Sequence, residues 1–242
     1  MIAIISDIHG NYSALAAVLA EIDRIGAGRI VCLGDTAGYY CDVNECVEAL
    51  RKRGIASLMG NHDQYLTSGA GCPRSTSANL CLDYQRRVIT GNNLSWLAAS
   101  RSRGRIDGVS MVHGGWNDPI DEYVYEVAAE YFAPLDGTHF VSGHTHVQGV
   151  WPAGAKVYCN PGSVGQPRDG DPRAAFAVWA DGAFALHRVE YDIEAMCRRM
   201  ERAGFEPHVS ANLFHGTRIG GSLSHITCRD ATSARPDSSR SS

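Results

Sequence analysis

Five short apolar segments of this chain each run directly into a loop that carries aspartate, asparagine or histidine. The segments are residues 2–5, 30–33, 55–59, 109–112 and 138–141. Their length and continuous apolar character are typical of buried strands. Between several of these segments, apolar residues recur at helical spacing. This alternation of strands and helices predicts an α/β fold. Because ligands of α/β folds gather beyond the carboxyl ends of the strands, we expect these polar loops to converge on one site.

Two helices have the clearest sequence signals. Apolar residues recur at helical spacing up to residue 25, with Asn11 as the expected N-cap and Gly26 as the stop. The second helix is expected over residues 42–53, where Asp42 and Glu45 have the spacing of a capping box.

Further helices and strands are predicted in the second half of the chain. Helices are expected over residues 122–132 and 192–203. Two hairpins are expected, one turning at residues 153–154 and the other at 181–182. Beyond Pro207 serine, threonine, arginine and glycine dominate. We therefore expect one domain over residues 1–206 and a C-terminal tail over 207–242, outside the core and largely disordered.

Composition narrows the classes of function. With 242 residues, of which 44% are hydrophobic, the chain can bury one sizeable core. The net charge is −4 and no long basic run occurs, which argues against a long nucleic acid as partner. The eight cysteines form no Cys-x-x-Cys pair, and neither an export signal nor an apolar run of about 20 residues is visible. We expect a cytoplasmic protein with reduced thiols and no membrane contact.

The polar residues at the strand ends carry the chemical information. Taken singly, each has an ordinary explanation, since Asp7 could cap a turn and Asn61 could form an Asx turn. Taken together, five motifs occur in order, each after an expected strand and nearly all beside a glycine. The motifs are Asp7-x-His9, Gly34-Asp35, Gly60-Asn61-His62-Asp63, His113-Gly114 and Gly143-His144-x-His146.

This ordered set resembles the motifs of the calcineurin-like metallophosphoesterases, and most closely those of the small, single-domain prokaryotic phosphodiesterase branch. Residues 44–47 and 160–168, the latter reading NPGSVGQPR, are also typical of that branch. The resemblance covers roughly residues 1–190. It implies a four-layer αββα sandwich, in which two mixed β-sheets are flanked by helices.

The resemblance also implies two divalent transition metal ions. One would be held by Asp7, His9, Asp35 and His146. The other would be held by Asp35, Asn61, His113 and His144, so that Asp35 bridges the two. The ligands are imidazoles, carboxylates and an amide without thiolate, which suits Mn, Fe, Ni or Zn without choosing among them. Mn is the expected metal.

The mechanism implied by the family is attack of a metal-bridging hydroxide on the phosphoester. His62 resembles the general acid that protonates the leaving group. Asn11 and Arg168 are expected phosphate contacts, although Arg168 has a surface turn as an equal alternative.

The expected substrate is a small phosphodiester or phosphomonoester. Alternatives are a protein phosphatase, a dinucleoside polyphosphate hydrolase, or a non-catalytic scaffold of the same fold. The scaffold is disfavoured because all seven implied ligands and His62 are present. The expected partner is thus a small phosphoester, with homo-oligomerisation left open.

Overall fold

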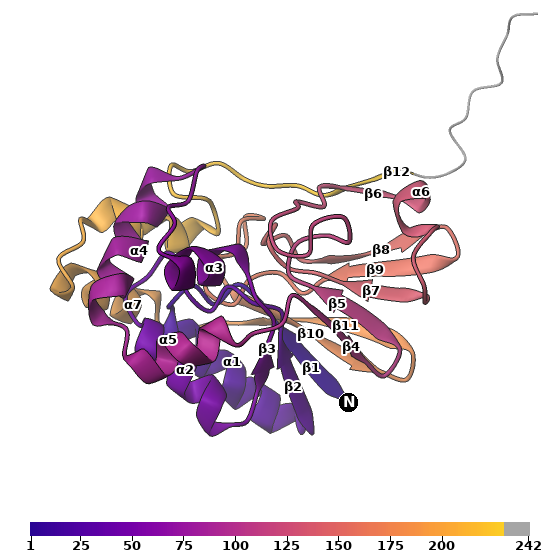
Figure 1. The fold of residues 1–242 in the computed structure, drawn as a ribbon, viewed down its shortest axis with the longest axis horizontal. Coiled ribbons are helices and arrows are strands. Elements are labelled where there is room, and N and C mark those ends of the chain that lie inside the picture. Colours follow the sequence, from indigo (N-terminus) through magenta and orange to yellow (C-terminus); the bar gives the residue numbers. More distant parts are fainter. Residues whose placement is uncertain (230–242) are drawn as a thin grey trace, which may run out of the picture.

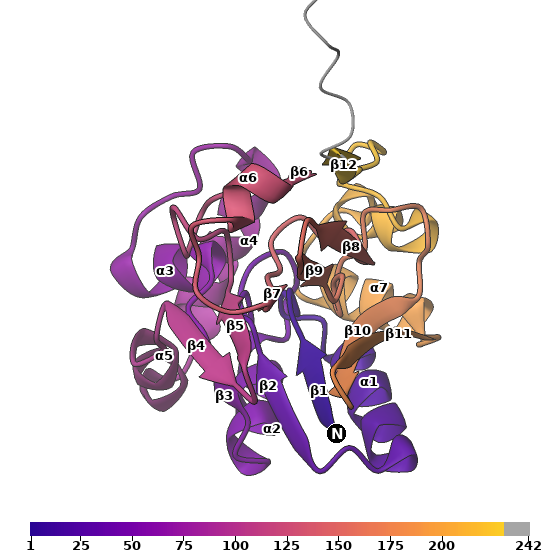
Figure 2. The ribbon, with the colours of Figure 1, turned by 90° about the vertical axis from the view of Figure 1, so that its right-hand side faces the viewer.

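The computed structural model describes residues 1–229, in which two five-stranded mixed sheets pack face to face (Figures 1 and 2). The first sheet has the order β11-β10-β1-β2-β3. Its strands are β1 (Ile2–Ile5), β2 (Arg29–Cys32), β3 (Ala56–Ser57), β10 (Ala174–Ala180) and β11 (Ala183–Val189). Strand β1 pairs parallel with β2 and antiparallel with β10.

The second sheet has the order β4-β5-β7-β9-β8. Its strands are β4 (Arg103–Ile106), β5 (Val109–Val112), β7 (His139–Val141), β8 (Gly149–Ala153) and β9 (Lys156–Asn160). Strands β5, β7 and β9 are parallel, while the edge strands β4 and β8 are antiparallel to their neighbours. The expected fold of two mixed sheets flanked by helices is confirmed.

Strand β1 shows why the apolar runs are continuous. Ala3 and Ile5 face the cluster formed with helices α1 (Tyr12–Ile25) and α2 (Val43–Lys52), whereas Ile2 and Ile4 face the cluster between the sheets. Since successive side chains of a strand point to opposite faces, a strand covered on both sides is apolar at every position.

The remaining helices lie outside the sheets. They are α3 (Asn61–Ser68), α4 (Thr76–Val88), α5 (Gly91–Ala98), α6 (Ala129–Phe132) and α7 (Ile193–Arg202). Figure 1 shows α1, α2 and α7 on the side of the first sheet, and α6 beyond the second. No helix within residues 1–229 combines the length and apolar character needed to cross a bilayer.

Of the two expected N-terminal helix caps, the one at Asn11 is present and the one at Asp42 is absent. Asn11 caps α1, since its side chain accepts a hydrogen bond from Ala14 N at 3.0 Å, and Gly26 ends the helix in a left-handed conformation. Asp42 begins α2 but makes no side-chain capping bond, so the expected capping box is absent. Its Oδ2 instead lies 2.7 Å from Nε of Arg199 on α7, so Asp42 forms an ion pair between the two helices.

The expected helix over residues 122–132 is wrong except for its last turn. Residues 126–128 form strand β6 (Glu126–Ala128), which pairs in parallel with β12 (Thr227–Arg229). Val127 and Phe132 are buried against the outer face of the second sheet. Pairing with a distant segment therefore overrides the local helical spacing.

The expected tail is also corrected for residues 207–229. Short 3₁₀ helices cover Pro207–Val209 and Ala211–His215. Val209 and Leu213 are each 1% exposed and pack with Met196 and Met200 of α7. Residues 217–226, here called the strap, then run across the molecule to β12 beside β6 (Figure 1). Only residues 230–242 of the expected tail lie outside the described residues.

Candidate metal centre

The structure brings all seven expected ligands together at the carboxyl ends of the central strands. Asp7 follows β1, Asp35 follows β2, His113 follows β5 and His144 follows β7, while Asn61 begins α3. None of the seven is more than 2% exposed. Burying this many polar groups in one place is unfavourable unless they are paired or bind a ligand.

The backbone at this site is strained. Five of the seven expected ligands have positive φ angles, namely Asp7 (55°), His9 (55°), Asp35 (54°), His144 (67°) and His146 (60°). Residues other than glycine rarely adopt this left-handed conformation, and such strain clusters at functional sites. Of the non-glycine residues described, only Asp107 and Asp181 share it, and both lie in hairpin turns.

Glycine makes room for two of the carboxylates. A Cβ atom on Gly60 would lie 2.1 Å from Asp35 Oδ1, and one on Gly143 would lie 2.6 Å from Asp7 Oδ2. These glycines therefore allow the close approach of backbone and side chain that the sequence predicts.

Carbonyl oxygens fix the orientation of three histidine rings. Nδ1 lies 2.9 Å from Ala37 O in His9, 3.1 Å from Leu33 O in His113, and 2.6 Å from Gln166 O in His146. Because a carbonyl oxygen only accepts, each Nδ1 carries the hydrogen and each neutral ring has its lone pair on Nε2. Metal-binding histidines are commonly oriented in this way.

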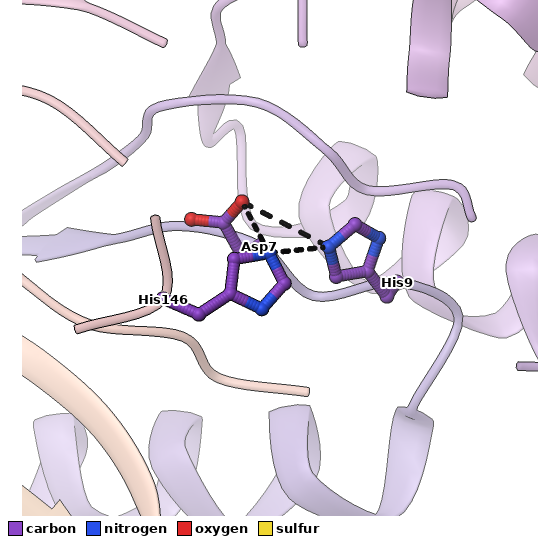
Figure 3. A group of neighbouring side chains, drawn as sticks. All are labelled: Asp7, His9 and His146. Carbon is purple, nitrogen blue, oxygen red and sulfur yellow. Dashed lines mark hydrogen bonds and ion pairs between the residues drawn. The ribbon is translucent and has the colours of Figure 1, made fainter. Parts of the chain in front are cut away.

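The Nε2 atoms of His9 and His146 point at each other and at Asp7 (Figure 3). They lie 3.0 Å apart, and Asp7 Oδ1 is 3.2 Å from His146 Nε2 and 3.8 Å from His9 Nε2. Two lone pairs and a carboxylate oxygen repel one another at these distances unless a proton or cation lies between them. This cluster therefore has the composition and geometry of a cation site.

A second cluster adjoins the first through Asp35. Asp35 Oδ2 lies 3.4 Å from His113 Nε2 and 3.7 Å from His9 Nε2, yet it has no hydrogen-bond partner. Asn61 Oδ1 is 3.3 Å from His113 Nε2, and His144 completes the group with an Nε2 that also lacks a hydrogen-bond partner. The described residues thus contain three overlapping groups of His and Asp that could hold a metal ion. They are Asp7, His9 and His146; His9, Asp35 and His62; and Asp35, His113 and His144.

The protonation states of the histidines differ. Burial lowers the pKa of His9 and of His146 well below the usual value, and for His146 the charges of Arg168 and Arg218 act in the same direction. Burial also acts on His113, but the carboxylates of Asp35 and Asp7 outweigh it and raise the pKa of His113 to about 9. Near neutral pH, His9 and His146 are neutral while His113 is protonated.

His62 lies at the edge of this centre. Its backbone N donates to Asp35 Oδ1 at 2.9 Å, and its ring centroid is 5.0 Å from that of His9. The side chain is 5% exposed and its Nδ1 has no hydrogen-bond partner in residues 1–229. Asp63 does not orient it, because the Asp63 carboxylate accepts from Ala37 N and Gly60 N.

The two expected phosphate contacts differ in their surroundings. Asn11 has an internal partner for each side-chain group, since Oδ1 accepts from Ala14 N while Nδ2 donates to Gly165 O and the Tyr191 hydroxyl. The structure thus supports a structural role for Asn11 in place of a phosphate contact. Arg168 is 3% exposed, so it does not lie in a surface turn.

Two neighbours of His144, and the arginine that pairs with one of them, have no signal in the sequence. Tyr123 stacks on the His144 ring at 3.7 Å between centroids, and Asp121 Oδ1 lies 3.5 Å from His144 Nε2. Arg74, from the loop before α4, pairs with Asp121. Asp121 and Tyr123 belong to an irregular segment after β5, where no motif or periodicity marks them.

The segment NPGSVGQPR braces the ligand loops. Asn160 Nδ2 donates to Gly143 O at 2.7 Å, and Ser163 Oγ donates to Asp7 O at 2.7 Å. Gln166 accepts from His146 through its carbonyl and from Arg168 through its side chain. This motif therefore positions the two loops that carry four of the expected ligands, namely Asp7, His9, His144 and His146.

Comparison with known proteins agrees with this geometry. The sequence model of the calcineurin-like phosphoesterase superfamily domain matches residues 1–181. An uncharacterised protein of Methanocaldococcus jannaschii is 31% identical over 239 residues, which cover 89% of this chain and 98% of that protein. The crystal structure of a metallophosphoesterase from Sphaerobacter thermophilus has 32% identity and a TM-score of 0.77, covering 89% of this chain and 98% of that one. The crystal structure of a hypothetical protein from Pyrococcus horikoshii shares the fold. It is 20% identical to this chain and has a TM-score of 0.80, covering 89% of this chain and 99% of that one.

Proposed function

Because the chain belongs to the calcineurin-like phosphoesterase superfamily, we propose that it is a binuclear metal-dependent hydrolase of small phosphodiesters or phosphomonoesters. One observation carries this proposal. The Nε2 lone pairs of His9 and His146 face each other at 3.0 Å, and the carboxylate oxygen Oδ2 of Asp35 lies 3.7 Å from His9 Nε2. Such an arrangement of electron pairs is stable around cations and unfavourable without them.

The donor set fits two divalent ions. Asp7, His9, Asp35 and His146 would hold one, and Asp35, Asn61, His113 and His144 the other. These ligands include no thiolate, which suits Mn, Fe, Ni or Zn alike, and Mn is the ion that we propose first. Two such ions would supply an activated water and charge stabilisation for the phosphoryl oxygens.

The remaining polar groups have separate roles in this proposal. The backbone N of His62 donates to Asp35, while its ring Nδ1 has no hydrogen-bond partner in residues 1–229; in this proposal the ring donates a proton to the leaving alkoxide. Arg168 is buried beside Gln166, and its guanidinium lies 5.4 Å from the Tyr39 ring, where it binds the phosphoryl group. Tyr123 stacks on His144 and limits the access of water from that side.

Turnover of chromogenic substrates tests the proposal. Purified protein loaded with Mn should hydrolyse bis(p-nitrophenyl) phosphate or p-nitrophenyl phosphate, and Asp7→Asn should abolish this activity. A protein that binds two metal ions but turns over neither substrate would favour the non-catalytic scaffold. A phosphopeptide cleaved in preference to both would favour a protein phosphatase.

A further inference from the structure

Two arginines near the candidate metal centre lack an acidic partner. Arg168 is 3% exposed and Arg218 is half-buried, yet neither forms an ion pair with any aspartate or glutamate within residues 1–229. Arg74 differs, because Asp121 neutralises it. A buried guanidinium without a counter-charge is unfavourable, so such groups commonly bind an anionic ligand.

The strap holds Arg218 beside Arg168. Arg218 Nε donates to Ser224 Oγ at 3.0 Å, and Ser224 N donates to Arg168 O at 2.8 Å. Ser224 is 5% exposed, so it joins the two arginines through one buried residue. The strap is therefore built against the loop that carries Arg168.

A column of aromatic rings connects Arg218 to the metal centre. Arg218 Nη2 donates to the Tyr125 hydroxyl at 2.6 Å. Tyr125 stacks on Tyr123 at 5.2 Å between ring centroids, and Tyr123 stacks on His144 at 3.7 Å. Arg218 thus lies on the side of the centre where these half-buried tyrosines form a wall.

From these contacts we propose that Arg218 binds a second anionic group of the substrate, so that the site favours phosphoesters with two phosphoryl groups. The inference rests on the proposed phosphoesterase function and adds a substrate class to it. Arg168 receives the scissile phosphoryl group at the metal centre, and Arg218 receives the other on the side of the tyrosine wall. A planar guanidinium forms bidentate hydrogen bonds with phosphoryl oxygens, so Arg218 would both bind and orient the second phosphoryl group.

The alternative is that Arg218 only fastens the strap through Tyr125 and Ser224. A fastening role predicts equal losses for all substrates together with a lower melting temperature. A binding role predicts a loss that depends on the second phosphoryl group.

The test compares alkyl monophosphates with alkanediol bisphosphates of matched chain length, using short, medium and long spacers. For the Mn-loaded protein, kcat/KM should be higher for at least one bisphosphate than for its monophosphate. Arg218→Gln should reduce this preference by roughly 10- to 100-fold, the effect of one hydrogen bond to a charged group. Arg218→Lys should restore part of it. Arg202→Gln, at an exposed arginine of α7, serves as the matched control and should leave the preference unchanged.

Several outcomes overturn the inference. Hydrolysis of monophosphates without preference for any bisphosphate would reject it while the proposed function stands. Equal losses on both substrates in Arg218→Gln, with a lowered melting temperature, would assign Arg218 to strap fastening. Absence of hydrolysis of every substrate would reject the proposed function as well.

Discussion

The Nε2 atoms of His9 and His146 lie 3.0 Å apart, although each ring directs its Nδ1 at a carbonyl oxygen. The two residues are 137 positions apart in the chain. Both have positive φ angles, of 55° and 60°. The fold therefore holds two strained loops so that two lone pairs face each other, and a bound cation is what makes this geometry favourable.

Asp35→Asn should disturb both metal sites at once. Asp35 Oδ2 lies between His113 Nε2 and His9 Nε2, and an amide in its place lacks the negative charge. We expect elemental analysis to find about two divalent ions per chain in the fully loaded protein and fewer than about one in the variant. Asp107→Asn, at an exposed hairpin position that also has positive φ, is the matched control. A full pair of ions in Asp35→Asn would rule out bridging by Asp35.

Metal affinity should increase with pH up to about 9. The pKa of His113 is raised to about 9, chiefly by Asp35, so below that pH a metal ion must displace a proton from this ring. His9 and His146 have lowered pKa values and are already neutral. The association constant should therefore fall about tenfold for each pH unit below 9.

Titration calorimetry in buffers of different ionisation enthalpy measures this proton directly. Near neutral pH we expect the unsubstituted protein to release about one proton more per loaded chain than His113→Gln, because a proton lost by metal-bound water is common to both. Metal binding without proton release in the unsubstituted protein would show that His113 is not the residue deprotonated.

The expected ligands could be found from the sequence because their signals are local. A short apolar strand, a glycine and an aspartate or histidine stand within a few residues of each other at Asp7, Asp35 and His144, and their order in the chain adds specificity. Their convergence then follows from strand direction alone.

Asp121, Tyr123 and Arg218 could not be found in this way. Asp121 and Tyr123 lie in the irregular segment that leads into β6, and Arg218 lies in the strap that leads into β12. These two strands pair with each other, and Glu126 lies opposite Thr227. No local periodicity encodes a contact between segments about a hundred residues apart, so helical spacing in residues 122–132 gave a wrong prediction. The same pairing explains why a serine- and arginine-rich segment has regular, hydrogen-bonded structure up to Arg229, although Thr227–Arg229 are exposed.

Truncation should therefore have two distinct outcomes. A chain ending at Glu206 loses Val209 and Leu213, which are each 1% exposed in the cluster around Met196 and Met200. Burial of two such side chains contributes about 3–6 kcal/mol, so we expect this truncation to lower the free energy of unfolding by about that amount. A chain ending at Arg229 keeps both residues and should unfold at the same urea concentration as the full chain. Equal stability of the two truncations would show that the packing of residues 207–229 contributes nothing.

His62→Ala should separate proton donation from metal binding. His62 lies beside Asp35 through its backbone N, but its ring nitrogen Nδ1 has no hydrogen-bond partner in residues 1–229. As a general acid it matters most for a leaving group that is unstable without a proton. An alkoxide is such a group, whereas p-nitrophenolate is stable as an anion. We therefore expect His62→Ala to slow the hydrolysis of alkyl phosphoesters by roughly 10²–10⁴-fold and that of p-nitrophenyl esters much less, with metal content unchanged.

The control for this variant is His208→Ala, at an exposed histidine outside the centre, which should leave both rates unaffected. A ring that only braces the loop, or that binds a metal ion, would give a different result. Both substrate classes would then slow together, and elemental analysis would find fewer metal ions in His62→Ala. Equal slowing at full metal occupancy would also reject the general acid, because the loss would no longer depend on the basicity of the leaving group.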